Sequence, residues 1–260
     1  MQDIKITLVQ AFQSWEDKEA NLSHFELLLE DLKETDLIVL PEMFHTGFSM
    51  NPAALAEAME GSRAVEWLAA MSAKKNAAIY TSFIAVAEGR FYNRGIFMLP
   101  SGEFTLYDKR QLFSLAGEDE VFSAGTTEII VDYKGWKFQL QVCYDLRFPE
   151  ISRNRLGANH SPVYDVILYI ANWPERRSAH WKALLTGRAI ENQCYVVGVN
   201  RIGIDGKELI YSGDSRIIDA MGDPVAALEA NLESVATVQL EREKLMSVRE
   251  KLSFLKDIKC

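Results

Sequence analysis

Short apolar runs that end abruptly in polar residues constrain the fold more than any other feature of this chain. Three such runs, LIVL (37–40), FQLQV (138–142) and DVILYIA (165–171), are followed at once or after one proline by Glu42, Cys143 and Asn172. Continuous or alternating apolar runs of this length are typical of buried strands. Ligands of α/β sheets bind at the carboxyl ends of the strands. We therefore expect these three strand ends to meet at one crevice.

Amphipathic stretches lie between the apolar runs. Apolar residues recur at intervals of three and four over 17–33 and 62–75, and a further helix is expected over 179–192. Strands paired by tight turns are expected over 78–99 and 128–142. No Gly/Ser-rich linker divides the chain. The alternation predicts one α/β domain over residues 1–260, with a mixed sheet or two sheets.

Charge and composition exclude several classes of protein. The net charge is −9 and no basic cluster interrupts it, so we expect no nucleic-acid partner. No apolar run reaches the roughly 18 residues of a membrane span, and no secretory signal is evident. Three cysteines in 260 residues do not form a disulfide framework, which predicts a reduced, cytoplasmic protein. The four histidines lack metal-ligand spacing, so we expect no metal site.

The residues at the strand ends suit nucleophilic catalysis. A cysteine thiol, with a pKa of about 8.5, is only a few per cent thiolate at neutral pH, so it needs a neighbouring base. Glu42 can accept the proton of Cys143, and Lys109, which follows a short strand over 104–107, can stabilise an oxyanion. Each residue also has a simpler interpretation: Cys143 as a small buried side chain, Glu42 as a loop carboxylate, and Lys109 as part of a solvated charge cluster.

Six motifs favour the catalytic interpretation. They are LPEMF (40–44), YDKR (107–110), VCYDLRFPE (142–150), NWPERR (172–177), RAIENQCYVVGVNRIG (188–203) and YSGDSRIIDAMG (211–222). In this order they resemble the nitrilase superfamily of carbon–nitrogen hydrolases. PEMFHTGFSM (41–50) and CYDLRFPE (143–150) are most similar to the omega-amidases, which act on 2-oxoglutaramate and 2-oxosuccinamate.

The resemblance implies a fold and a set of roles. The fold is a four-layer α-β-β-α sandwich that forms a homodimer through the face near the cysteine and uses no metal or organic cofactor. Cys143 is the nucleophile, Glu42 the general base and Lys109 the catalytic lysine. A second glutamate matches Glu118 best, although Glu120 lies close by.

The substrate implied is a small-molecule amide, and its identity is left open by the motifs. Another amidase, a nitrilase, an N-carbamoyl hydrolase, or a catalytically silent relative that binds a metabolite or partner protein remain alternatives. A substrate carboxylate needs a cation or several N–H donors. The candidate cations are Arg147, Arg176 and Arg177; Arg147 has the alternative of a structural ion pair near the dimer interface. The candidate apolar walls are Phe44, Phe113, Tyr144 and Trp173.

Overall fold

Two six-stranded sheets form the centre of the protein. The computed structural model describes residues 2–158 and 160–258. The first sheet has the strand order β14 (Ser234–Leu240), β1 (Ile4–Gln10), β2 (Leu37–Val39), β3 (Ala78–Ala87), β4 (Arg90–Met98) and β5 (Phe104–Asp108). The second has the order β13 (Pro224–Ala227), β12 (Arg216–Ile218), β9 (Tyr195–Asn200), β8 (Val166–Ala171), β7 (Trp136–Val142) and β6 (Ile130–Tyr133).

Each sheet is parallel at its centre and antiparallel at its edges. Strands β1, β2 and β3 run parallel, as do β7, β8 and β9. The edge strands are added by antiparallel pairing, such as β3 with β4 and β6 with β7. Parallel neighbours require crossover helices, which explains why the helical stretches of the sequence separate the buried strands.

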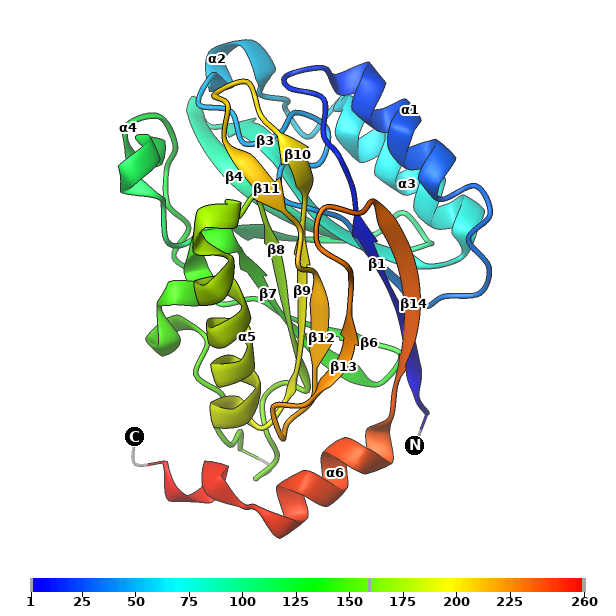
Figure 1. The fold of residues 1–260 in the computed structure, drawn as a ribbon, viewed down its shortest axis with the longest axis vertical. Coiled ribbons are helices and arrows are strands. Elements are labelled where there is room, and N and C mark those ends of the chain that lie inside the picture. Colours follow the sequence, from blue (N-terminus) through cyan, green and yellow to red (C-terminus); the bar gives the residue numbers. More distant parts are fainter. Residues whose placement is uncertain (1, 159, 259–260) are drawn as a thin grey trace.

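Helices cover the outer faces of both sheets (Figure 1). Helices α1 (Lys18–Leu28) and α3 (Arg63–Lys75) lie on the first sheet, and α5 (Ser178–Asn192) lies on the second. The remaining helices are α2 (Pro52–Leu55), α4 (Glu118–Val121) and α6 (Arg242–Lys251). The order helix, sheet, sheet, helix confirms the predicted four-layer sandwich.

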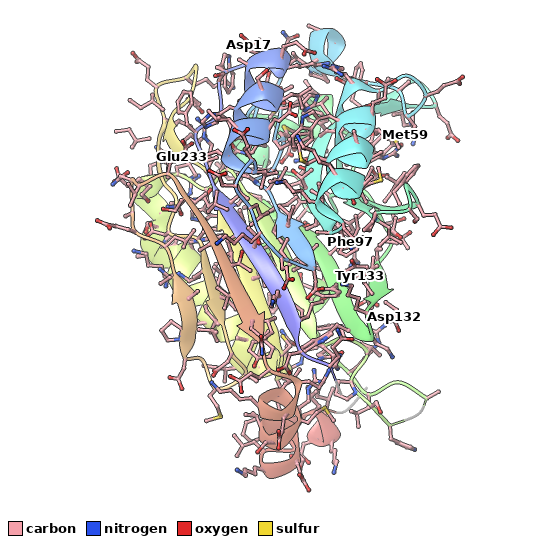
Figure 2. The ribbon with its side chains drawn as sticks, turned by 90° about the vertical axis from the view of Figure 1, so that its right-hand side faces the viewer. Asp17, Met59, Phe97, Asp132, Tyr133 and Glu233 are labelled. Atoms are coloured by element: carbon pink, nitrogen blue, oxygen red, sulfur yellow. The ribbon has the colours of Figure 1, made fainter. Side chains whose placement is uncertain are left out.

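The side chains of strand β2 and of Leu40, which follows it, pack alternately on the two sides of the first sheet. Leu37 and Val39 point into the apolar cluster between the sheets, whereas Ile38 and Leu40 belong to the cluster under α1 and α3. Alternate side chains of a strand point to opposite faces, so a strand between two layers has to be apolar throughout. In Figure 2, Phe97 of β4 and Tyr133 of β6 lie side by side where the sheets face each other, with ring centroids 5.8 Å apart.

The predicted elements differ from the structure mainly in length. The helix expected over 17–33 starts one residue late and ends at Leu28. Helix α2, strand β13 and the hairpin of β10 (Ile202–Ile204) and β11 (Ile210–Ser212) were not predicted, because three or four residues are too few for a periodic pattern. No helix in the described part of the chain is long and apolar enough to span a membrane. Cys143 and Cys194 are buried free thiols, and Cys260 lies outside the described residues.

Candidate active site

Cys143 sits at a sharp turn directly after β7. The strand ends at Val142 and a 3₁₀ turn over Cys143–Arg147 follows. The backbone of Cys143 has φ +45°, a left-handed conformation that non-glycine residues rarely adopt and that recurs at functional sites. The side chain is 8% exposed, and Sγ lies 4.0 Å from the carbonyl oxygen of Asn172. The turn therefore presents one nearly buried thiol at the end of a core strand.

A buried ammonium bridges two buried carboxylates beside this thiol. Lys109 Nζ lies 3.0 Å from Glu42 Oε1, and 2.9 and 2.8 Å from Glu118 Oε1 and Oε2. All three side chains are inaccessible to solvent. Glu42 follows β2 and Lys109 follows β5, so the strand ends of the first sheet converge on Cys143 of the second, as the sequence predicts.

Two asparagines orient the carboxylate of Glu42. Asn93 of β4 donates from Nδ2 to Glu42 Oε1 at 2.7 Å, and the backbone N–H of Asn172 donates to Glu42 Oε2 at 2.8 Å. Asn172 lies at the end of β8, where the sequence places it. Asn93 is a contact of Glu42 that the sequence did not predict. Strand β4 also carries Arg90 and Arg94, so its pattern does not single out Asn93.

The structure separates the two candidate glutamates. Glu118 is fully buried, and its Oε2 also accepts a hydrogen bond of 2.6 Å from the backbone N–H of Phe113. Glu120 is exposed on the opposite side of the short helix α4. The geometry therefore supports Glu118, and not Glu120, as the second carboxylate.

Burial and neighbouring charges set the protonation states. Burial raises the pKa of the Cys143 thiol well above its ordinary value, and the charge of Glu42 adds to this effect while Lys109 opposes it. Burial alone lowers the pKa of Lys109, but the charges of Glu118 and Glu42 outweigh burial and raise it overall. At neutral pH the resting site therefore holds a charged lysine and a protonated thiol, so that a nearby base is needed for attack.

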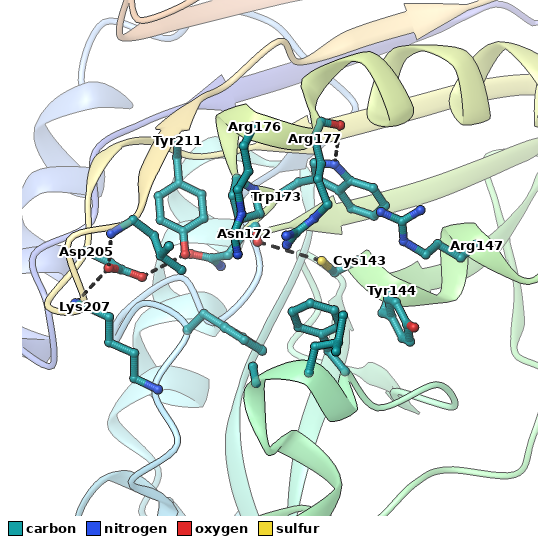
Figure 3. A pocket seen from close by; sticks show the side chains of 16 residues that line it. Cys143, Tyr144, Arg147, Asn172, Trp173, Arg176, Arg177, Asp205, Lys207 and Tyr211 are labelled. Atoms are coloured by element: carbon teal, nitrogen blue, oxygen red, sulfur yellow. Dashed lines mark hydrogen bonds between the residues drawn. The ribbon is translucent and has the colours of Figure 1, made fainter.

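A cavity of about 380 Å³ opens in front of the thiol (Figure 3). Its lining includes six of the seven candidate cations and apolar walls named from the sequence: Phe113, Tyr144, Arg147, Trp173, Arg176 and Arg177. The cavity is also lined by Phe48, Asn172 and Tyr211, and by Asp205 and Lys207 from the turn of the β10–β11 hairpin. A cavity of this size suits a small molecule.

Phe44 does not line the cavity, and its prediction as a wall is wrong. The ring is fully buried under α1 and α3, with its centroid 5.8 Å from Phe25 and 5.5 Å from Trp67. The chain reverses at Met43, which has φ +46°, and this reversal sends Phe44 toward the helices. Phe48 takes the place at the cavity, and its ring centroid lies 5.2 Å from Lys109 Nζ.

The cavity is rich in cations that no described carboxylate neutralises. Arg147 stacks on Trp173 at 4.6 Å and Arg177 on Phe113 at 5.2 Å. Within residues 2–158 and 160–258, neither these two arginines nor Arg176 has a carboxylate within ion-pair distance. Burial lowers the pKa of Arg177, and repulsion from Arg176 lowers it further. The wall therefore presents a cationic surface near Cys143.

Metal-ligating groups are not gathered anywhere in the described chain. Among these residues, no group of three or more His, Cys, Asp or Glu side chains is placed to hold a metal ion. His45, three residues after Glu42, instead directs Nε2 to Glu57 Oε1 at 3.1 Å.

Comparison with known proteins places this geometry in a family. Residues 5–250 match the model of the carbon-nitrogen hydrolases. The omega-amidase YafV of Escherichia coli (strain K12) is 43% identical over 257 residues, which cover 99% of this chain and 97% of that protein. The 2-oxoglutaramate amidase of Bacillus subtilis (strain 168) is 32% identical, with coverage of 98% and 97%.

A solved structure supports the same family membership. XC1258 from Xanthomonas campestris, described as a CN-hydrolase superfamily protein with an arsenic adduct in its active site, superposes with a TM-score of 0.97 at 39% identity, covering 100% of this chain and 98% of that one. The resemblance drawn from the motifs is confirmed. The chain belongs to the carbon-nitrogen hydrolase family, and it is a hydrolase that acts on carbon–nitrogen bonds.

Proposed function

We propose that the protein is an omega-amidase, which hydrolyses the terminal amide of a small omega-amidodicarboxylate such as 2-oxoglutaramate or 2-oxosuccinamate. The observation that carries this proposal is the buried Glu42–Lys109–Glu118 cluster beside Cys143, whose side chain lines a cavity with a cationic wall. Relatives named omega-amidase and 2-oxoglutaramate amidase support the assignment.

In the first half-reaction Cys143 Sγ attacks the amide carbon while Glu42 accepts the thiol proton. The C–S bond forms and the carbonyl electron pair moves to oxygen, where Lys109 and the backbone N–H of Tyr144 stabilise the charge. When the intermediate collapses, the C–N bond breaks and Glu42 returns its proton to the departing nitrogen. Ammonia leaves and an acyl-thioester remains on Cys143.

In the second half-reaction water replaces ammonia. Glu42 accepts a proton from the water as its oxygen attacks the thioester carbon, and the C–S bond then breaks. The proton passes to sulfur, which releases the carboxylic acid and restores the thiol. Glu118 keeps Lys109 charged and in place throughout, through its two contacts of 2.9 and 2.8 Å.

The arginines supply the means to bind the second carboxylate of such a substrate. The chain is acidic overall, so its net charge does not attract an anion, and local cations have to do so. Arg177 faces Cys143 in Figure 3 and interacts with it electrostatically, whereas a guanidinium nitrogen of Arg147 lies 3.3 Å from His180 Nδ1. This difference favours Arg177 over Arg147 as the carboxylate-binding residue. We expect Arg177→Met to raise KM for 2-oxoglutaramate at least about tenfold while leaving a neutral aliphatic amide little changed.

Ammonia release from a substrate panel tests the proposal. The panel contains 2-oxoglutaramate, 2-oxosuccinamate, glutamine, carbamoyl-β-alanine and a simple nitrile, with wild type compared with Cys143→Ala. Cys194→Ala is the matched control, because this thiol is fully buried away from the cavity. We expect the two oxo-acid amides to be preferred and only Cys143→Ala to be inactive. Preference for another member of the panel would replace the omega-amidase assignment, and wild-type rates in Cys143→Ala would overturn the mechanism.

Three further properties are proposed with this function. The protein forms a homodimer, for which Ile190 of α5 and Met221, both exposed and apolar, are candidate contacts, and light scattering should give twice the mass of 29.4 kDa. It acts in the cytoplasm, which cell fractionation tests. It needs no cofactor or metal, so dialysis against a chelator should leave ammonia release unchanged.

A further inference from the structure

A third buried carboxylate, beside those of Glu42 and Glu118, lies near the reaction centre and takes no part in the chemistry described above. Asp145, two residues after Cys143, is inaccessible to solvent. Its Oδ2 accepts hydrogen bonds of 2.8 Å from the hydroxyl of Tyr107 and from the backbone N–H of Val142. Its Oδ1 accepts one of 2.9 Å from the backbone N–H of Gln111.

These three donors flank the catalytic residues. Val142 immediately precedes Cys143, whereas Tyr107 and Gln111 lie two residues before and two residues after Lys109. Strand β5, which contains Tyr107, is an edge of the first sheet, and β7, which ends at Val142, belongs to the second. One side chain therefore ties both sides of the lysine to the base of the cysteine turn, across the interface between the sheets.

Other backbone contacts of Lys109 do not reach the second sheet. Its N–H donates to the carbonyl oxygen of Asn93 at 3.0 Å, and its own carbonyl oxygen accepts from Gly125 at 2.9 Å. Asp145 supplies what these bonds lack, a direct link between the lysine segment and a cysteine turn held at φ +45°. A misplacement of catalytic groups by about 1 Å can lower the rate of a reaction by about a hundredfold. A link that fixes Lys109 relative to Cys143 should therefore affect kcat.

We infer that Asp145 is a positioning residue, which fixes the distance between Lys109 and Cys143 by joining the two segments that hold them. The inference rests on the proposed roles of these two residues but not on the identity of the amide. It requires Asp145 to be ionised, since only a carboxylate accepts from all three donors without presenting a proton of its own.

The surroundings of Asp145 connect this requirement to pH. Burial raises the pKa of the Asp145 carboxyl to about 6, although the hydrogen bonds and the charge of Lys109 act to lower it. The titratable groups that face it are Tyr107 and Lys109 at the end of β5, Tyr80 from β3 and Tyr169 from β8. Removing one donor should therefore raise the pKa of Asp145 further. As the pH is lowered, Asp145 would then be protonated, and the enzyme would lose activity, at a higher pH than in wild type.

Tyr107→Phe is the test variant, because it removes one donor and keeps the ring. Tyr164→Phe is the matched control: Tyr164 is equally buried and its hydroxyl also donates one hydrogen bond, to the backbone oxygen of Ser152, away from the cavity. We measure kcat and KM with the best amide of the panel, the rate of Cys143 alkylation by iodoacetamide, and the thermal midpoint of each variant.

We expect Tyr107→Phe to lower kcat about tenfold with KM within twofold, and to move the acidic limb of the kcat profile to higher pH. Tyr164→Phe should lower the thermal midpoint without changing kcat or the pH profile. Asp145→Asn should have a larger effect on kcat, because its amide NH₂ faces a backbone N–H in either orientation.

The outcomes separate this inference from the proposed function. If Tyr107→Phe loses only thermal stability and keeps the kcat and pH profile of Tyr164→Phe, Asp145 is structural and the inference is wrong. If Cys143→Ala remains active, the proposed mechanism itself fails, whatever the tyrosine variants do. Alkylation by iodoacetamide reports the geometry at Cys143 even if none of the panel amides is a substrate.

Discussion

Replacing Lys109 by methionine should test the buried charge cluster most directly. Methionine has nearly the same length but no charge, so Glu42 and Glu118 lose their shared cation while both remain inaccessible to solvent. Removing one partner of a buried ion pair typically costs about 3–5 kcal/mol, because the remaining charge stays buried without compensation. Three contacts of 2.8–3.0 Å are lost here, so we expect a decrease in the free energy of unfolding at the upper end of that range.

Urea unfolding followed by tryptophan fluorescence measures this decrease, with Lys33→Met as the control because Lys33 is exposed. Adding Glu118→Gln to Lys109→Met should restore part of the lost stability, since it removes one uncompensated charge. Lys109→Met should also lower kcat by about 10²–10³, the usual effect of losing one oxyanion donor. A Lys109→Met protein as stable as wild type at pH 8 would refute the reasoning.

Three further predictions concern the neighbouring residues. Glu118→Gln should lower kcat for ammonia release strongly while Glu120→Gln leaves it unchanged, because of these two glutamates only Glu118 contacts Lys109. Equal effects would contradict the choice of Glu118 as the second carboxylate. Phe44→Ala should destabilise the fold by about 3–5 kcal/mol in urea unfolding, as expected for a ring deleted from a packed core; a loss below 1 kcal/mol would place Phe44 at the cavity after all. Because the pKa of the Cys143 thiol is raised, alkylation of Cys143 by iodoacetamide, quantified by mass spectrometry, should continue to accelerate above pH 9; a plateau near pH 7 would indicate a resting thiolate.

The strand ends were predictable because their signal is local. An apolar run that stops at Glu42 or Cys143 identifies both the strand and the residue at its end. Lys109 was identified in the same way, from the short strand over 104–107, and the motifs supported it. The position of Phe44 was not predictable in the same way. It depends on the reversal at Met43, a left-handed backbone conformation that non-glycine residues adopt only under tertiary constraint.

Hydrogen bonds between the two sheets could not be predicted from the sequence either. The hydrogen bond between Asn172 and Glu42 joins residues 130 positions apart, and no pattern within one strand specifies it. The role of Asp145 is of the same kind, because its three donors come from β5 in the first sheet, from the loop that follows β5, and from β7 in the second sheet. Periodicity predicts which face of an element is buried, whereas the partner of a buried polar group is settled only by how the layers pack.

The cavity combines a floor of core strand ends with walls that belong to surface segments. Cys143 is anchored at the end of β7, whereas Arg176 and Arg177 lie on a short 3₁₀ turn over Glu175–Arg177, and Asp205 and Lys207 lie on the β10–β11 hairpin. Loops tolerate substitution far better than packed strands do. Such a division lets descendants of one ancestral enzyme acquire new acyl-group preferences by exchanging wall residues, while the bond-breaking apparatus is inherited unchanged. Substrate range and reaction chemistry can therefore evolve at different rates within the same fold.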